Sequence, residues 1–263
     1  KAKINKIDDK LILELMNKGE IPIIAGFQGI DDDNNIVTLG RGGSDTSAVA
    51  IAAAIRADRC DIYTDVDGVY TTDPRIVKNA KKLNKISYEE MLEFASLGAK
   101  VLQTRSVEMA MRHGVTVQVL SSQTGKTGTF LTKEDEKMEN ELVSGIAYSK
   151  DEANVTLINI LDKPGVATKI FTPLSEANIN VDMIVQTGSE NGNKINFTYT
   201  VSRKDLEQTI SIMEKNKTDI KFERIITNNS LAKVSIVGLG MRTHTGVANK
   251  MFSALASKNI NIH

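Results

Sequence analysis

The feature that most constrains the fold is an internal repeat in the second half of the chain. The segment "GVATKIFTPLSEANIN" at residues 165–180 returns as "GVANKMFSALASKNIN" at residues 246–261. Around the first copy, hydrophobic patterning predicts the order strand, helix, strand, strand, helix, strand, which is typical of a ferredoxin-like unit. A repeat at a fixed offset indicates a duplicated module. Because the sequence stops after the helix of the second copy, we expect that unit to be incomplete.

The first half of the chain alternates helical and strand patterns, as α/β proteins do. We expect a helix over 8–20, a buried strand over 21–27 ("IPIIAGF"), a polar loop over 28–37, an alanine-rich helix after residue 42 and a buried strand over 60–66. Further helices are expected over 87–98, with a capping box formed by Ser87 and Glu90, and over 103–114, which Gly114 closes. Strands are expected over 115–122 and 127–132. The polar run 133–141 is the expected linker.

Composition narrows the class of partner. The chain has 263 residues, and its 33 basic and 33 acidic side chains cancel, which gives no reason to expect nucleic acid or an anionic membrane as partner. No apolar run reaches the roughly 18 residues of a membrane span. The single cysteine, Cys60, is expected to be a buried thiol rather than a nucleophile, and it fits a reducing cytoplasm. Because the charges balance and no membrane span is expected, small molecules are the expected ligands.

The sequence does not begin with an initiator Met, so the chain is expected to be a piece of a longer protein.

A glycine-rich loop leads into the alanine-rich helix in "TLGRGGSDTSA", residues 38–48. It matches neither the Walker A pattern nor the dinucleotide glycine pattern. A helix N-terminus attracts anions, and the guanidinium of Arg41 suits a carboxylate. Asp45 either caps the helix or faces a positive group of the ligand, and an amino acid carries both charges. A glycine-rich turn with an Asp cap and a surface Arg is the alternative.

Two further segments are candidates for a nucleotide site. "YTDVDGVYTTDPR", residues 63–75, follows a buried strand, and open α/β sheets bind ligands at the carboxyl ends of their strands. A plain turn explains it equally well. "GAKVLQTRSVE", residues 98–108, places Lys100 before a helix, where it suits phosphates or backbone contact with a base; a solvated lysine is the alternative. The three histidines have no metal-ligand spacing, so no metal site within the protein is expected. Phosphoryl transfer remains open because it needs only positioning, charge stabilisation and Mg²⁺.

In this order, and followed by two ferredoxin-like units with "DKPG", the three segments resemble the aspartate kinase family. The resemblance implies an amino-acid-kinase-type α/β fold, a mostly parallel sheet sandwiched by helices, followed by βαββαβ ACT domains. The implied boundaries are 1–132 for the carboxyl-terminal half of the kinase domain, 133–141 for the linker, 142–228 for the first ACT domain and 229–263 for an incomplete second one. Relatives that act on uridylate, glutamate or acetylglutamate share the sheet but differ at the glycine loop and lack the paired tail.

The resemblance also implies a reaction and regulation. The γ-phosphoryl group of Mg-ATP would pass to the β-carboxylate of L-aspartate, giving 4-phospho-L-aspartate at the start of lysine, threonine and methionine synthesis. ACT domains would bind an amino-acid effector, threonine or lysine or both, and would pair their sheets in a homodimer or higher oligomer. A cytoplasmic location is expected.

Individual residues receive roles from the same resemblance. Arg41 would bind a substrate carboxylate, and Asp45 would face the ammonium group and help to organise the reacting groups. Arg41 and Asp45 are the implied catalytic residues. The implied aspartate site also contains Gly42, Gly43 and Ser44. The implied ATP site consists of Thr64, Asp65, Tyr70, Arg75, Lys100 and Val101. The implied effector site consists of Asp162, Gly165, Val166, Ala167, Asn180, Val181, Asp182, Gln186, Asn261 and Ile262. For the asparagines, a turn residue after a helix is the alternative.

One departure from the family pattern bears on activity. The Lys-Phe-Gly-Gly loop that carries the family's catalytic lysine is absent from these 263 residues, and nothing in residues 1–19 replaces it. We therefore expect this chain by itself to be inactive. The alternative hypothesis is a non-catalytic regulatory subunit that binds amino acids.

Overall fold

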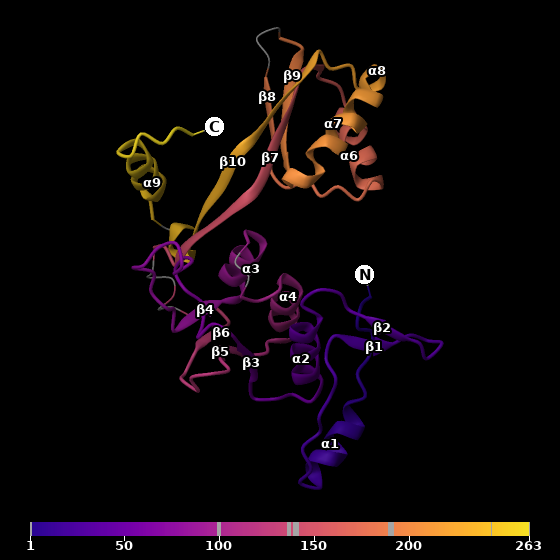
Figure 1. Cartoon of the computed structure of the whole chain (residues 1–263), viewed down its shortest axis with the longest axis vertical. Coiled ribbons are helices and arrows are strands. Elements are labelled where there is room, and N and C mark those ends of the chain that lie inside the picture. Colours follow the sequence, from indigo (N-terminus) through magenta and orange to yellow (C-terminus); the bar gives the residue numbers. More distant parts are fainter. Residues whose placement is uncertain are drawn as a thin grey trace. The chain divides into compact units, whose positions relative to one another are not determined.

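The computed structural model describes residues 2–98, 101–135, 138, 142–188, 192–242 and 244–262. The chain divides into two compact units, Lys1–Ala147 with Ser235–His263, and Tyr148–Val234 (Figure 1). Two long strands, β7 (Gly145–Leu161) and β10 (Arg224–Val237), cross between the units. The predicted domain boundaries remain predictions, and residues 136–137 and 139–141 of the predicted linker lie outside the described residues.

The first unit contains a four-stranded sheet in the order β3-β5-β6-β4. Its strands are β3 (Cys60–Thr64), β4 (Lys85–Ser87), β5 (Val117–Ser121) and β6 (Thr129–Thr132). β3 pairs with β5 and β4 pairs with β6 in parallel, whereas β5 and β6 are antiparallel. All five residues of β5 are buried, as expected of a strand that is covered on both faces. The predicted α/β architecture with a parallel-containing sheet is confirmed.

Three predicted helices cover this sheet: α2 (Gly43–Ala54), α3 (Tyr88–Ser96) and α4 (Thr104–His113). α2 packs on α4 and β3, and α3 packs on α4, β4 and β6. The capping box of Ser87 and Glu90 is present, and Gly114 ends α4 in the left-handed conformation. Met91, Phe94 and Val107 are fully buried in the core, which also contains Cys60. Cys60 is buried, as predicted, and this burial raises the pKa of its thiol to about 11.

Two predictions for the first 40 residues are wrong. The predicted helix exists as α1 (Asp9–Asn17), but the apolar run that follows it is not a strand. Ile21 and Ile23 are 89% and 96% exposed, and the contacts of the run lie at its end, where Phe27 is hydrogen-bonded to the Leu39 N–H and to the Ser47 hydroxyl. The predicted polar loop instead contains a hairpin of β1 (Gln28–Ile30) and β2 (Ile36–Thr38). The Asp31 carboxylate closes its turn by accepting the backbone N–H groups of Asp33 and Asn35.

The second unit has the predicted ferredoxin-like fold. After β7 come α6 (Val166–Glu176), β8 (Ile184–Gly188), β9 (Lys194–Val201), the 3₁₀ turn η1 (Arg203–Asp205), α7 (Leu206–Lys215), α8 (Lys217–Ile220) and β10. The sheet order is β10-β7-β9-β8, and Figure 1 shows α6 and α7 on one side of the sheet. Alternate residues of β9, from Ile195 to Val201, point into a separate hydrophobic core beneath these helices.

The repeat has a backbone explanation. Gly165 and Gly246 precede α6 and α9 (Val247–Ala256) with φ angles of 88° and 96°, and Asn178 and Asn259 follow the helices with φ angles of 56° and 54°. These left-handed conformations favour glycine and asparagine, so both repeats retain them. A 3₁₀ turn, η2 (Leu239–Arg242), joins β10 to this second copy. Within the described ranges, every helix is too short or too polar to cross a bilayer.

Candidate functional site

The glycine loop lies at the N-terminus of α2. Gly42 is the N-cap with a φ of 71° and, being glycine, offers no side chain to cap the helix. The Gln103 side chain lies directly over it, since a Cβ on Gly42 would lie 1.7 Å from Gln103 Cγ. Arg41 and Ser44 are exposed, whereas Gly43 is buried. The first turn of α2 therefore presents backbone N–H groups beside an accessible guanidinium, an arrangement that suits a carboxylate.

Asp45 is half-buried in the first turn of α2 and is not its N-cap. The capping alternative for this residue is therefore wrong, because Gly42 occupies that position. Burial raises the pKa of Asp45, and a hydrogen bond from the Gln103 backbone opposes this shift. Gln103 belongs to the nucleotide candidate at residues 98–108 and immediately precedes α4, so this contact joins that segment to the glycine loop. The structure thus brings together two of the three segments that the sequence singled out.

Arg105 is a positioning residue that sequence reasoning missed. From α4 it donates hydrogen bonds of 2.8 Å to the backbone carbonyl of Leu39 and of 2.8 Å to that of Ala2. Leu39 immediately precedes the glycine loop, so Arg105 fixes the point at which the chain enters it. Its position within "QTRSVE" carries no sign of this role, because the two carbonyls come from distant segments.

The nucleotide candidate at residues 63–75 begins at the carboxyl end of β3. Thr64 pairs with Ser121 across the parallel sheet, and its carbonyl accepts a hydrogen bond of 2.9 Å from the Ser122 backbone. The Thr64 hydroxyl donates to Asp65, which is exposed. The carboxyl ends of two parallel strands thus meet where the sequence predicted a ligand.

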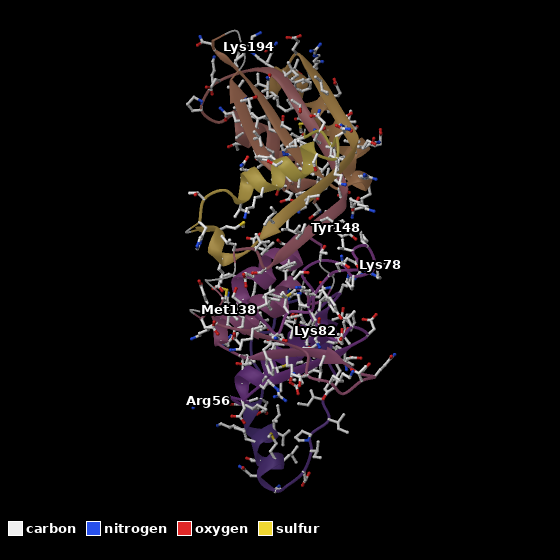
Figure 2. The ribbon with its side chains drawn as sticks, turned by 90° about the vertical axis from the view of Figure 1, so that its left-hand side faces the viewer. Arg56, Lys78, Lys82, Met138, Tyr148 and Lys194 are labelled. Atoms are coloured by element: carbon white, nitrogen blue, oxygen red, sulfur yellow. The ribbon has the colours of Figure 1, made fainter. Side chains whose placement is uncertain are left out.

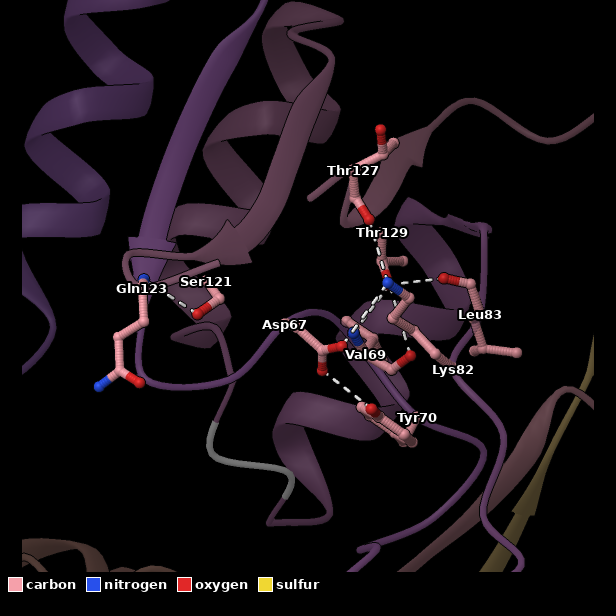
Figure 3. A network of polar contacts seen from close by, with 9 residues as sticks. All are labelled: Asp67, Val69, Tyr70, Lys82, Leu83, Ser121, Gln123, Thr127 and Thr129. Atoms are coloured by element: carbon pink, nitrogen blue, oxygen red, sulfur yellow. Dashed lines mark hydrogen bonds and ion pairs between the residues drawn. The ribbon is translucent and has the colours of Figure 1, made fainter. Parts of the chain in front are cut away.

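A polar network supports the turn that follows β3 (Figure 3). The Tyr70 hydroxyl donates to Asp67 at 2.8 Å, and Lys82 Nζ lies 3.7 Å from Asp67 and 3.0 Å from the Thr127 carbonyl. The hydrogen bond to Asp67 raises the pKa of Tyr70. Deeper in, the buried Thr129 hydroxyl accepts the Val69 N–H and donates to the Leu83 carbonyl. The turn is therefore held in place by two other chain segments, which goes beyond what a plain turn requires.

The remaining predicted nucleotide residues differ in accessibility. Arg75 forms a bidentate ion pair with Asp73, and its side chain is 84% exposed. Such an exposed pair is weak enough for a phosphate to compete with it. Val101 is half-buried, and Lys100 lies outside the described residues. Lys82 was missed by sequence reasoning, because four lysines between residues 78 and 85 look alike without their contacts.

Comparisons with known proteins identify the family. The model of the amino acid kinase family matches residues 1–121, and ACT domain models match residues 155–217 and 234–263. An aspartate kinase of Pseudomonas putida is 52% identical over 263 residues, covering 100% of this chain and 64% of the relative. The chain belongs to the aspartate kinase family. The chain thus spans just under two thirds of the length of this relative.

Two solved structures of E. coli aspartokinase III extend the match to the fold. The complex with aspartate and ADP (R-state) superposes with a TM-score of 0.77 at 32% identity, over 97% of this chain and 56% of that one. The complex with lysine and aspartate (T-state) gives a TM-score of 0.75 at the same identity and coverage. The aspartate kinase fold therefore extends over almost the whole described chain.

The residues that the aspartate kinase resemblance assigned to an effector fall into separate groups. Asp162, Gly165, Val166 and Ala167 lie at the end of the second unit where Leu161 pairs with Lys194, whereas Asp182 is hydrogen-bonded to Thr200. Lys194 and Thr200 are six residues apart on β9, which corresponds to roughly 20 Å of strand. Figure 2 shows the Lys194 end of the unit, which is remote from Tyr148. Asn180 and Val181 go with Asp182, and Gln186 lies between the groups, paired with Phe197.

The two groups differ in what their side chains contact. Asp182 forms an ion pair with Lys233 of β10, which also lies 3.8 Å from Glu152 of β7. The Asp162 group surrounds the open N-terminus of α6, and its residues are exposed except for the half-buried Val166. Asn261 and Ile262 are exposed and belong to the first unit. Within residues 148–234 the implied effector residues therefore form two groups, and the effector site itself remains a prediction.

Proposed function

We propose that the protein transfers the γ-phosphoryl group of Mg-ATP to the β-carboxylate of L-aspartate. The observation that carries this proposal is the contact of Gln103 with Gly42 and Asp45, by which a proposed nucleotide segment meets the proposed amino-acid loop. It is supported by the E. coli relative that was solved with aspartate and ADP. The product would be 4-phospho-L-aspartate, which opens lysine, threonine and methionine synthesis.

In this proposal the N-terminus of α2 holds the amino acid. Arg41 and the first-turn N–H groups bind a carboxylate, and Asp45 binds the ammonium group with help from the exposed Ser44. Partial burial suits Asp45, because a half-buried carboxylate gains from a cationic partner. Gly42 and Gly43 leave room for Gln103, Leu39 and Phe27 to pack against the loop that would hold the ligand. The remaining carboxylate of aspartate is then directed away from α2 toward the nucleotide.

The chemical step requires no general base. An ionised β-carboxylate oxygen forms a bond to the γ-phosphorus while the bond from phosphorus to the oxygen bridging the β- and γ-phosphates breaks, and ADP takes the electron pair. No proton moves, so the protein's part is to position the groups and stabilise charge. Thr64, Asp65, Tyr70, Arg75 and Val101 would hold the nucleotide together with Lys100.

The donor set fits magnesium that arrives with ATP. Mg²⁺ is commonly held by one or two carboxylates together with substrate phosphates. The described residues contain no group of three metal-ligating side chains, but Asp65 and Asp67 follow the strand end closely. Asp65, which is exposed, would contact the ion, while Asp67 remains paired with Tyr70 and Lys82.

An assay of ADP release tests the proposal on the full-length protein. We expect Mg-dependent release with L-aspartate and none above background with L-glutamate or without an amino acid. The 263-residue chain assayed in parallel should not turn over, since it does not contain the Lys-Phe-Gly-Gly loop that the family resemblance implies. If the full-length protein bound lysine or threonine but released no ADP, the alternative of a regulatory subunit would take its place.

We also propose feedback inhibition through the ACT domains, with lysine, threonine or both as effector. The E. coli relative solved with lysine and aspartate supports an amino-acid effector. Thermal-shift titration with each amino acid, alone and together, tests it, because a ligand that binds the native state raises its melting temperature. No stabilisation by either amino acid would exclude both as effectors.

ACT-mediated self-association is part of the same proposal. β8 lies at one edge of its sheet, and Met183, Ile184 and Val185 there are 42–51% exposed. An uncovered apolar edge strand is suited to pairing with another copy. Light scattering after size exclusion should give at least a dimer, and Ile184→Lys should shift it toward monomer. A wild-type monomer at micromolar concentration would contradict this assignment.

A further inference from the structure

Glu90 is a buried carboxylate that binds segments far apart in sequence. It is 4% exposed in the first turn of α3. One carboxylate oxygen accepts hydrogen bonds from the Ser87 N–H at 3.2 Å and the Ser87 hydroxyl at 3.1 Å. The other accepts the Ser144 hydroxyl and the Leu239 N–H, the latter at 3.2 Å. The capping box alone needs only the first oxygen, so the second one has a different role.

The partners of that second oxygen lie close to the ends of β7 and β10, the two strands that cross between the units. Ser144 directly precedes β7, which carries the chain into residues 148–234, and Leu239 lies two residues after the end of β10, which carries it back. The two crossings are also joined to each other, since the Ser144 N–H donates to the Val237 carbonyl at 2.8 Å. A displacement at the start of β7 or just after the end of β10 therefore acts on the hydrogen bonds of Glu90.

The start of β7 also contacts the nucleotide segment at residues 63–75. The Ile146 N–H at the start of β7 donates to the Thr71 carbonyl at 2.7 Å, and Thr71 follows Tyr70. Glu90 belongs to α3, which ends at Ser96, five residues before Val101. Thr71 is in turn paired with Lys81, next to Lys82 of the network in Figure 3. The crossings are thus hydrogen-bonded to the segment 63–75 at Thr71 and to α3 at Glu90, and α3 precedes the segment 98–108 along the chain.

We propose that Glu90 is a positioning residue that couples effector binding in residues 148–234 to the nucleotide segments at Tyr70 and Val101. This inference rests on the proposed feedback inhibition. Buried donors are costly to leave unpaired, so a shift of β7 against β10 moves α3 with it instead of breaking these hydrogen bonds. Neither effector nor substrate needs to touch Glu90. Coupling of this kind changes the effect of one site on the other and leaves each site's own contacts in place.

Glu90→Gln in the full-length protein tests the proposal. Glutamine keeps the shape of the side chain but presents only one acceptor oxygen, so it cannot serve both Ser87 and the crossing segments. We expect the L-lysine or L-threonine concentration for half-inhibition to rise about 10-fold. Effector binding, followed by calorimetry, should change much less. A purely structural role would lower the melting temperature without separating inhibition from binding.

Two further variants keep the test decisive. Glu108→Gln removes an exposed carboxylate on the neighbouring helix α4 and should leave inhibition unchanged. Ser144→Ala removes one donor to Glu90 and should weaken inhibition in the same direction, which provides the result if Glu90→Gln does not fold. Unchanged inhibition in a folded Glu90→Gln or Ser144→Ala variant overturns the inference, as does a parallel loss of effector binding. A wild-type enzyme that neither amino acid inhibits would instead refute the proposed feedback.

Discussion

Arg105 holds Leu39 by a hydrogen bond of 2.8 Å between its guanidinium and the backbone carbonyl, across 66 residues of sequence. This contact fixes the entry to the glycine loop, so Arg105→Gln should misplace Arg41 and Asp45. A misplaced substrate-binding group costs up to about 100-fold in rate, so we expect kcat/KM for aspartate to fall roughly 10- to 100-fold. Initial-rate kinetics of the full-length protein measure it. Arg112→Gln, an exposed change on the same helix, should leave kcat/KM within twofold.

Asp45→Asn should abolish activity while stabilising the fold. Because burial raises the pKa of Asp45 above its ordinary value of 3.8, the ionised side chain costs stability at neutral pH. The protonated Asp45 side chain does not carry this cost. Its contribution to the stability of the fold is therefore fully present below pH 3.8, the ordinary pKa, and is lost as the pH rises through the folded-state pKa. The variant should therefore melt at a higher temperature than wild type at pH 7, with the difference vanishing toward pH 3.5. An equal or lower melting temperature at pH 7 would contradict this effect of burial on Asp45.

Tyr70→Phe should weaken ATP binding and leave aspartate binding intact. It removes the hydroxyl that donates to Asp67, and a single hydrogen bond of this kind is worth about 1 kcal/mol, or roughly fivefold in KM for ATP. Lys82→Met, which removes the cation beside Asp67, should act in the same direction. The control is Tyr63→Phe on β3, where the side chain is exposed. If KM for aspartate rose instead, the turn would belong to the amino-acid site.

Gln186→Ala should relieve inhibition, since Gln186 lies on the exposed strand β8 between the two groups of predicted effector residues. We expect the effector concentration for half-inhibition to rise about 5-fold or more, with the uninhibited rate within twofold of wild type. Inhibition curves with L-lysine and L-threonine measure it. Gln208→Ala on α7 is the matched exposed control. A loss of uninhibited rate with unaltered inhibition would refute the assignment.

Local patterns predicted most of the fold. The capping box at Ser87, the left-handed glycine after α4 and the alternation in β9 are set by nearby residues, so the sequence contains their cause. The run 21–27 misled because its composition suits a buried strand, whereas burial depends on neighbours that a local pattern does not contain. The hairpin at 28–38 was missed because three-residue strands are too short to show periodicity.

The candidate site was predictable in its motifs but not in its contacts. Glycines, Arg41 and Asp45 stand together in the sequence, and their charges suggested an amino acid. Gln103 and Arg105 act on that loop from α4, and Glu90 joins residues more than 50 positions away, so only the fold brings these partners together. The effector residues of the first repeat were predicted as one set, because sequence order does not reveal that they lie beside opposite ends of β9.

The most direct test of the central claim is to trap the product. The full-length protein is incubated with Mg-ATP, L-aspartate and hydroxylamine, and the hydroxamate is identified by mass spectrometry against standards for both carboxyl positions. We expect β-aspartyl hydroxamate that depends on ATP and is lost in Arg41→Ala and Asp45→Asn. ATP turnover without hydroxamate, or hydroxamate at the α-carboxyl group, would contradict it.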